Sequence, residues 1–335
     1  MVVHFLLLIF TDAQWYSLCA QVTETREQAL AKSTRRNLRT HLRAYLLFCI
    51  YFQIPPFPVL EQPLSCFIQV LINSFKSPGA VQNYAHGLQT VCKFLNQPCP
   101  DLSQFLFAYL FKGSSRVLQH MPNRAQPLTP LILTQLFYLI DHTDSYFAAW
   151  WAALTTGFFS FARISNLLPR SHNTKHPIQH LLRSNIQVHP QCTIINFTHS
   201  KTNQNGDRVL AIPLSPISSV ICPVWALNNM FSINVAPTWA PAFSFTHNNI
   251  LLTLTQHSFI SMLRQLLSLL NLDPAQFSGH SMRRGGATHA FDSGVPAEMI
   301  QVHGDWRSDS YLTYLHLSDI QRLQVTSLMG QNIIS

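Results

Sequence analysis

The sequence predicts a mainly helical protein of two domains, with a small antiparallel β-sheet in the second. Its length of 335 residues suggests two domains, since one domain typically has about 100–200 residues. Apolar residues recur at helical spacing on both sides of a polar, basic stretch, and strand-like alternation occurs between residues 184 and 212. We therefore divide the chain into an N-terminal extension (1–24), a helical domain (25–113), a linker (114–126) and a second domain (127–335).

The N-terminal extension contains an apolar run from Phe5 to Phe10. A secretory signal peptide carries basic residues ahead of its apolar run, and neither Lys nor Arg precedes Phe5. We interpret the extension as an apolar helix that packs on the first domain. A signal peptide is the alternative.

The first domain is predicted to contain helices over residues 33–43, 63–74 and 79–95. Ser33 is a suitable N-cap for the first of them. Arg35, Arg39 and Arg43 recur every four residues along this helix and form a basic stripe. The stripe contacts phosphates or is simply a solvated face. The net charge of +8 and the pI of about 9.3 favour a polyanionic partner.

The second domain contains the most apolar stretch of the chain, residues 145–162. A membrane-spanning helix would be at its length limit here, and the Gly, Thr and Ser residues within the stretch favour a buried helix instead. Strands are predicted over 184–188, 193–198 and 209–212, with a turn at 203–207. Lys201 lies just before that turn. Further helices are predicted over 222–230 and 256–271, on either side of a loop at 238–245.

The stretch from Gly279 to Tyr314 gathers an unusual set of side chains in a weakly charged chain. His280 and Arg283 lie one helical turn apart, and the Gly285-Gly286 pair lets another backbone or a ligand approach closely. An apolar helix over 296–302 ends in a turn at 303–305, where we interpret His303 as a helix C-terminal cap. Trp306 follows, and then a helix with Tyr311 and Tyr314.

Such side chains suit the cleavage of a phosphodiester. Arginine guanidinium groups stabilise the charge that builds up on phosphate oxygens in the transition state. A tyrosine phenol, with an ordinary pKa of about 10, becomes a useful nucleophile only where its surroundings activate it.

The ordered pattern of His280, Arg283, Trp306 and Tyr314 resembles the tyrosine recombinases, and is most similar to those of eukaryotic mobile elements. The motif Ala162-Arg163-Ile164-Ser165-Asn166-Leu167 resembles the family's first arginine motif. Asn166 stands where many members have an acidic residue, and an amide can still accept a hydrogen bond from a guanidinium group. A helix-end arginine that binds carbonyl groups is the alternative for Arg163.

The resemblance implies a DNA recombinase whose catalytic domain cleaves and rejoins strands without a metal or cofactor. It implies Tyr314 as the nucleophile, Arg163 and Arg283 as phosphate ligands, His280 as base, Lys201 as general acid and Trp306 as support for the phosphate. Trp306 is eight residues before Tyr314, which selects Tyr314 over Tyr311. Arg284 is a further candidate for contact with DNA or for a structural role.

The resemblance also implies that residues 25–113 form a core-binding domain that clamps double-stranded DNA. We expect Arg35, Arg39, Arg43 and Arg284 to be the DNA-binding residues, in a homodimer or tetramer on DNA. The tail, residues 317–335, either docks into a neighbouring subunit or folds back on its own domain. A nuclear location and an origin in a mobile element are expected.

Three alternatives compete with this interpretation. A domesticated DNA-binding protein would keep the fold with a silent site, and a type IB topoisomerase would share the chemistry in a larger chain. A membrane protein would require 145–162 to span a bilayer. The seven cysteines include no Cys-x-x-Cys pair, and the 16 histidines no His-Glu-x-x-His motif, so neither a disulfide framework nor a metal site is predicted.

Overall fold

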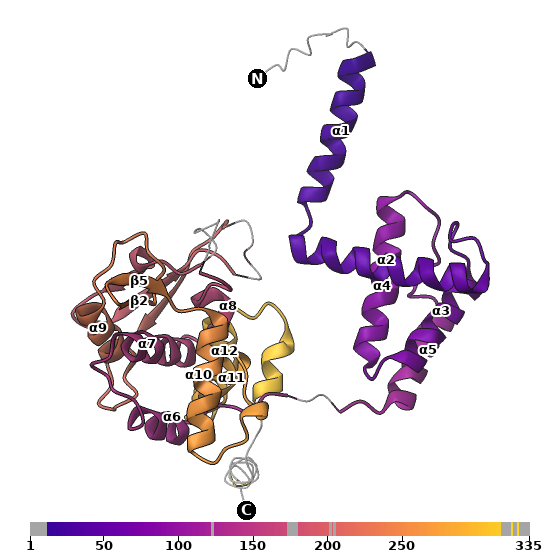
Figure 1. The fold of residues 1–335 in the computed structure, drawn as a ribbon. Coiled ribbons are helices and arrows are strands. Elements are labelled where there is room, and N and C mark those ends of the chain that lie inside the picture. Colours follow the sequence, from indigo (N-terminus) through magenta and orange to yellow (C-terminus); the bar gives the residue numbers. More distant parts are fainter. Residues whose placement is uncertain are drawn as a thin grey trace, which may run out of the picture. The chain divides into compact units, whose positions relative to one another are not determined.

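The computed structural model describes residues 12–121, 124–172, 180–200, 203 and 206–315, together with residues 323 and 327. The chain divides into two compact units, one up to Pro122 and one from Asn123. Both are largely helical (Figure 1). The chain is thus mainly α-helical with small antiparallel sheets, which confirms the fold class predicted from the sequence.

In the described part of the first unit, the regular secondary structure is all helical. The helices are α1 (Asp12–Gln28), α2 (Lys32–Phe52), α3 (Glu61–Ser74), α4 (Pro78–Phe94) and α5 (Phe105–Leu118). Apolar side chains from α2 to α5 form its core, with Tyr45, Phe67, Leu88 and Phe107 fully buried. Each of the three predicted helices therefore packs one apolar face on this core, as the spacing of its apolar residues predicts.

Three features of the first unit differ from the sequence-based expectations. Helix α2 begins at Lys32, with Ala31 as its N-cap, so Ser33 lies inside the helix and caps nothing. Helix α5 was not predicted, and it includes residues 114–118 of the expected linker. Residues 12–26 of α1 are exposed, so this part of the extension does not pack on the domain as expected; the apolar run at 5–10 lies outside the described residues.

The second unit combines helices with a three-stranded sheet. Its helices are α6 (Pro130–Phe137), α7 (Ser145–Phe159), α8 (Ile164–Leu167), α9 (Pro223–Ile233), α10 (Gln256–Leu269), α11 (His280–Asp292) and α12 (Ala297–His303), with the 3₁₀-helices η2 (Arg183–Asn185), η3 (Pro274–Gln276) and η4 (Asp309–Tyr314). The antiparallel strands β1 (Ile186–Val188), β2 (Thr193–Phe197) and β3 (Leu210–Leu214) pair in the order β1-β2-β3.

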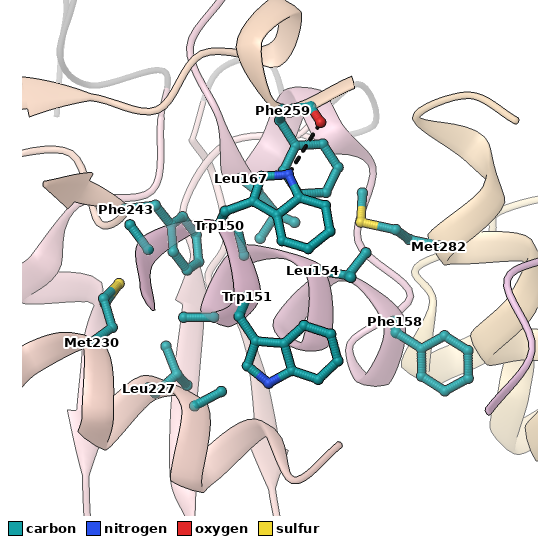
Figure 2. Packing of buried hydrophobic residues seen from close by; sticks show 14 of the residues in the cluster. Trp150, Trp151, Leu154, Phe158, Leu167, Leu227, Met230, Phe243, Phe259 and Met282 are labelled. Carbon is teal, nitrogen blue, oxygen red and sulfur yellow. Dashed lines mark hydrogen bonds between the residues drawn. The ribbon is translucent and has the colours of Figure 1, made fainter. Parts of the chain in front are cut away.

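Helix α7 is the central element of this unit (Figure 2). Its residues from Ala148 to Phe158 are all buried. The Trp150 ring stacks on Phe259 of α10, and its Nε1–H donates to the Phe259 carbonyl oxygen over 3.2 Å. The apolar stretch is therefore the centre of a protein core. No helix in the described part of the chain is long and apolar enough to cross a membrane.

A second hairpin, formed by β4 (Ser244–His247) and β5 (Ile250–Thr253), replaces the end of the loop expected at 238–245. Its turn residues Asn248 and Asn249 have φ angles of 50° and 61°. Two successive left-handed residues are typical of a type I′ turn, which asparagine tolerates better than most residues. The Asn-Asn pair was thus a sequence signal for this hairpin.

The Gly285-Gly286 pair lies in α11 where two other backbone segments approach it. A Cβ at Gly285 would overlap the carbonyl oxygen of Leu128, and a Cβ at Gly286 would overlap that of Phe158 at the end of α7. The sequence suggested that either another backbone segment or a ligand approaches this glycine pair, and the structure shows backbone segments there. The close approach fixes α11 against α7, and thereby the position of Arg283.

We expect Gly286→Ala to lower the free energy of unfolding by about 1–3 kcal/mol or more, because a backbone carbonyl cannot move aside as a flexible side chain can. Urea unfolding followed by circular dichroism measures this change. Gly113→Ala in α5 is the matched control, since a Cβ there meets nothing within 4 Å. The control should be neutral or stabilising by up to about 1 kcal/mol. Equal stability of Gly286→Ala and wild type would contradict the packing described.

Candidate active site

Arg283 of α11 is a deeply buried cation of the second unit, with 3% of its surface exposed. Its Nη1–H donates to the Phe161 carbonyl, and its Nη2–H donates to the Gly304 carbonyl over 2.8 Å. Phe161 follows α7 and Gly304 follows α12, so the chain ends of two helices hold this guanidinium group. Such fixed donors are what stabilisation of a phosphate transition state requires.

Trp306 covers the guanidinium group. The Cζ atom of Arg283 lies 3.6 Å from the centre of the Trp306 ring, within the range of a strong cation–π contact. A Cβ at Gly304 would overlap this ring, so glycine is needed two residues before the tryptophan. Trp306 is buried and anchors a small cluster with Phe161, Ile300 and Tyr311.

Both tyrosines of η4 contact Trp306. The ring centre of Trp306 lies 5.7 Å from that of Tyr314 and 6.3 Å from that of Tyr311. Tyr311 is buried, whereas Tyr314 is half-buried, and Thr288 of α11 donates to the Tyr314 carbonyl over 2.9 Å. Tyr314 is thus the more accessible of the two phenols. Because the helix is 3₁₀, residues three apart eclipse each other instead of lying about 60° apart as expected for an α-helix.

Arg163 is the half-buried N-cap residue of α8. The pKa of Arg283 is lowered to about 9, mainly by burial and also by the positive charge of Arg163, while the Tyr314 side chain and the Asp305 carboxylate act in the opposite direction. Arg283 therefore stays a cation at neutral pH. Arg283 thus lies near Arg163 and Tyr314 and under Trp306, so that residues from three separate segments come together at one place.

The remaining predicted residues differ in what the structure says of them. His280 begins α11 and is exposed, with its backbone N–H donating to the Ser278 hydroxyl over 3.2 Å. Arg284 is half-buried, and its Nη1–H donates to the Ala125 carbonyl over 2.9 Å, a contact that supports its structural alternative. Lys201 lies outside the described residues, as does the tail except for residues 323 and 327.

His303 was expected to cap its own helix, and this expectation is wrong. Its ring Nε2 lies 2.9 Å from the carbonyl oxygen of Phe159, the last residue of α7, and the ring packs edge-on against Phe161. Burial lowers the pKa of His303, so the neutral ring donates to the carbonyl at neutral pH. His303 thus ties the end of α12 to the end of α7, beside the groups that hold Arg283.

Sequence reasoning missed three residues beside this site. Asp305 forms an ion pair with Arg208, which lies shortly before β3. Asn203 is buried, and its Nδ2 group donates to the carbonyl oxygens of Thr198 over 2.8 Å and Arg208 over 2.6 Å. An isolated turn asparagine gave no signal for this role, and the Arg208–Asp305 pair joins residues 97 apart. Only the fold brings them together.

The predicted basic stripe lies on one face of α2. A surface groove there is lined by Lys32, Arg35, Arg36, Arg39, Thr40 and Arg43. All six side chains come from the first three turns of the helix, and five of them are basic. In the part of the chain that the structure describes, no group of three or more His, Cys, Asp or Glu residues could hold a metal ion.

Comparisons with known proteins place the fold. No protein-family model matches the chain. A curated relative, an integrase/recombinase xerD homolog of Selenomonas ruminantium, is 31% identical over 122 residues, which cover 35% of this chain and 35% of the relative.

Among solved structures, the Tn1549 transposon integrase in complex with transposon right end DNA aligns with a TM-score of 0.57 at 14% identity, over 92% of this chain and 98% of the integrase. The XerH site-specific recombinase, in a post-cleavage complex with its difH substrate, aligns with a TM-score of 0.54 at 13% identity. The alignment covers 81% of this chain and 70% of the recombinase. A lambda integrase dimer bound to a core site aligns with a TM-score of 0.52 at 14% identity. The alignment covers 93% of this chain and 78% of the integrase chain. The chain thus resembles the tyrosine recombinases in its sequence motifs and has their fold.

Proposed function

We propose that this protein is a site-specific DNA recombinase that cleaves and rejoins strands through a 3′-phosphotyrosyl intermediate. The observation that carries the proposal is the arrangement of Tyr314, Arg283 and Trp306, in which a half-buried phenol lies beside a rigidly held guanidinium group. The fold and the partial match to a recombinase homolog support it.

In the proposed reaction the Tyr314 phenolic oxygen attacks a DNA phosphorus atom, and its proton passes to His280 or to water held there. The bond from phosphorus to the 5′-oxygen breaks, and the leaving oxygen takes a proton from Lys201. Arg163 and Arg283 bind the non-bridging oxygens as their charge increases. Attack by a 5′-hydroxyl on the phosphotyrosine reverses these steps, so the bond energy is retained and no cofactor is needed.

The rigid setting of Arg283 is the main contribution of the fold to this chemistry. The Phe161 and Gly304 carbonyls accept hydrogen bonds from two of its N–H groups and so orient the planar guanidinium group. The Trp306 ring shields one face of that group from water. A phosphodiester that enters the site meets an arginine that is already in position. Such preorganisation avoids the cost of ordering a flexible cation at the moment of reaction.

We also propose that the groove on α2 binds the DNA backbone, as the positions of Arg35, Arg39 and Arg43 on one face suggest. Each phosphate contact that is lost should reduce the slope of log affinity against log salt by about 0.9. The triple variant with alanine at these positions should therefore bind duplex DNA more weakly and with a slope smaller by about 2–3 units. Fluorescence anisotropy over a salt series measures this slope.

The matched control for the groove is Arg116→Ala, which removes an exposed arginine from α5 of the same unit. It should leave the salt slope within about one unit of the wild-type value. An unchanged slope for the triple variant would show that the stripe is only a solvated face.

Association into dimers or tetramers on DNA, a nuclear location and an origin in a mobile element belong to the same proposal. The lambda integrase structure is described as a dimer on its core site, and the Tn1549 integrase as a transposon protein. Cross-linking of the DNA-bound protein tests the association.

Covalent trapping tests the activity. The protein is mixed with end-labelled duplex DNA from the flanks of its own gene, without added metal and with a chelator, and the reaction is stopped with detergent. A labelled species that is removed by protease supports the proposed intermediate. Measurable DNA binding without any adduct, on every flank fragment, would favour a silent DNA-binding protein with the same fold.

A further inference from the structure

The turn after α12 contains a carboxylate that the proposed reaction does not use. Asp305 exposes only 9% of its side chain, and it pairs with Arg208, whose side chain is 43% exposed. Its second carboxylate oxygen lies 3.5 Å from the Ser200 hydroxyl. Ser200 follows β2 and Arg208 precedes β3, so one carboxylate contacts both arms of the connection between the two strands.

The backbone conformation at position 305 is one in which an aspartate is unusual. Helix α12 ends in a Schellman motif, in which the Trp306 N–H donates to the Gln301 carbonyl and the Asp305 N–H to the Val302 carbonyl, each over 3.1 Å. Asp305 occupies its left-handed position, with a φ angle of 54°. Glycine is the usual residue there because it has no Cβ. Glycine would adopt this backbone conformation more easily than aspartate. We therefore look for the role of Asp305 in the contacts of its side chain.

The same turn also holds the candidate active site. Gly304, directly before Asp305, accepts the hydrogen bond from Arg283, and Trp306, directly after it, covers the guanidinium group. The Asp305 carboxylate itself raises the pKa of Arg283 and so favours the charged form. A contact between this turn and the β2–β3 connection therefore also sets the position of the connection relative to the proposed phosphate site.

The connection is already joined across its own arms. The buried Asn203 side chain binds the carbonyls of Thr198 and Arg208, and the backbones of Ser200 and Asn203 form an isolated bridge. These contacts link the two arms to each other. A single anchor to the α12 turn is then enough to position both.

We propose that Asp305 is a positioning residue that anchors both arms of the β2–β3 connection, at Ser200 and Arg208, to the turn that holds Arg283 and Trp306. The consequence for strand cleavage rests on the proposed function, whereas the anchor itself does not. Since Asp305 touches the reacting groups only through its neighbours, its loss should affect the rate of cleavage more than the affinity for DNA.

Hydrogen–deuterium exchange tests the anchor without DNA. Asp305→Asn keeps a residue that tolerates the left-handed backbone but removes the charge, and Asp305→Gly relieves the backbone. Both variants, and Arg208→Gln, should raise amide exchange at 198–200 and 206–210 roughly five- to tenfold. Arg208→Lys keeps the charge and should stay close to wild type. If Asp305 serves only the turn, Asp305→Gly will exchange like wild type and melt no lower, and the proposal is wrong.

Single-turnover cleavage tests the consequence, using the gene-flank DNA that gives the wild-type adduct. Asp305→Asn should cleave on the order of tenfold more slowly with DNA affinity within about twofold of wild type. Because salt screens the half-exposed ion pair, the rate difference should shrink at high ionic strength, which a simple loss of folded protein would not produce. Equal rates at all salt concentrations would contradict the positioning role. If wild type forms no adduct at all, the proposed function fails, and the exchange experiment alone decides the anchor.

Discussion

Tyr314→Phe should abolish the covalent protein–DNA adduct, with a loss on the order of 10⁴-fold or more in the rate of strand cleavage. The substitution removes one oxygen atom, the proposed nucleophile, and leaves the ring that packs against Trp306. Folding and DNA affinity should therefore stay at wild-type values. The measurement is detergent-stopped trapping on end-labelled DNA, with anisotropy on the same DNA to establish binding.

Tyr311→Phe is the matched control, because it removes the same atom from the other tyrosine of the same helix. Tyr311 is buried against Trp306, so this variant should form the adduct at a rate within a few-fold of wild type. An adduct lost in Tyr311→Phe and kept in Tyr314→Phe would leave the mechanism intact and reverse the assignment of the nucleophile. An adduct kept in both would exclude either residue as the nucleophile.

Arg283→Lys should lower the cleavage rate by about 10²–10³-fold although it preserves the charge. An ammonium group has no planar fork, so it cannot bind the Phe161 and Gly304 carbonyls, stack on Trp306 and still present donors to a phosphate. A carbonyl left without its donor in this buried place costs about 1–3 kcal/mol of stability. Single-turnover cleavage and urea unfolding measure the two effects separately.

Arg284→Lys controls for the general effect of replacing an arginine in α11. Arg284 is half-buried and makes one described hydrogen bond, to Ala125, so its replacement should cost less than about 1 kcal/mol and leave cleavage within a few-fold of wild type. If both variants cleave alike, Arg283 has no special role. If Arg283→Lys unfolds, circular dichroism will reveal it, and the milder Trp306→Phe, which retains a ring over the guanidinium group, then tests the same contact by cleavage rate.

The sequence was informative wherever the spacing of residues repeats a local geometry. Helical periodicity predicted α2, α3, α4 and α10, because the buried face of each helix recurs with the helical period. The boundaries were less accurate. Ser33 has the composition of an N-cap, yet α2 begins at Lys32, with Ala31 as its N-cap and no side-chain cap hydrogen bond. Helix α5 was missed because its polar second half resembles a linker.

Local sequence also predicted the chemistry, because a reactive site needs particular side chains in a particular order. His280, Arg283, Trp306 and Tyr314 lie within one stretch of the chain, and their order resembles that of the tyrosine recombinases, which implies phosphate binding and a tyrosine nucleophile. What the sequence determined by itself is therefore most of the elements and the set of candidate site residues, both of which depend on residues close together in the chain.

The tertiary structure decided what holds those groups. Arg283 is held by carbonyls that follow α7 and α12, 122 and 21 residues away; His303 binds α7 instead of its own helix; and Asp305 finds Arg208 across 97 residues. None of these contacts has a local signature, because a backbone carbonyl is present at every residue and an ion pair between distant residues depends on how the elements pack. The sequence names the proposed catalytic side chains, and the packing of α7, α11 and α12 gives Arg283 its geometry.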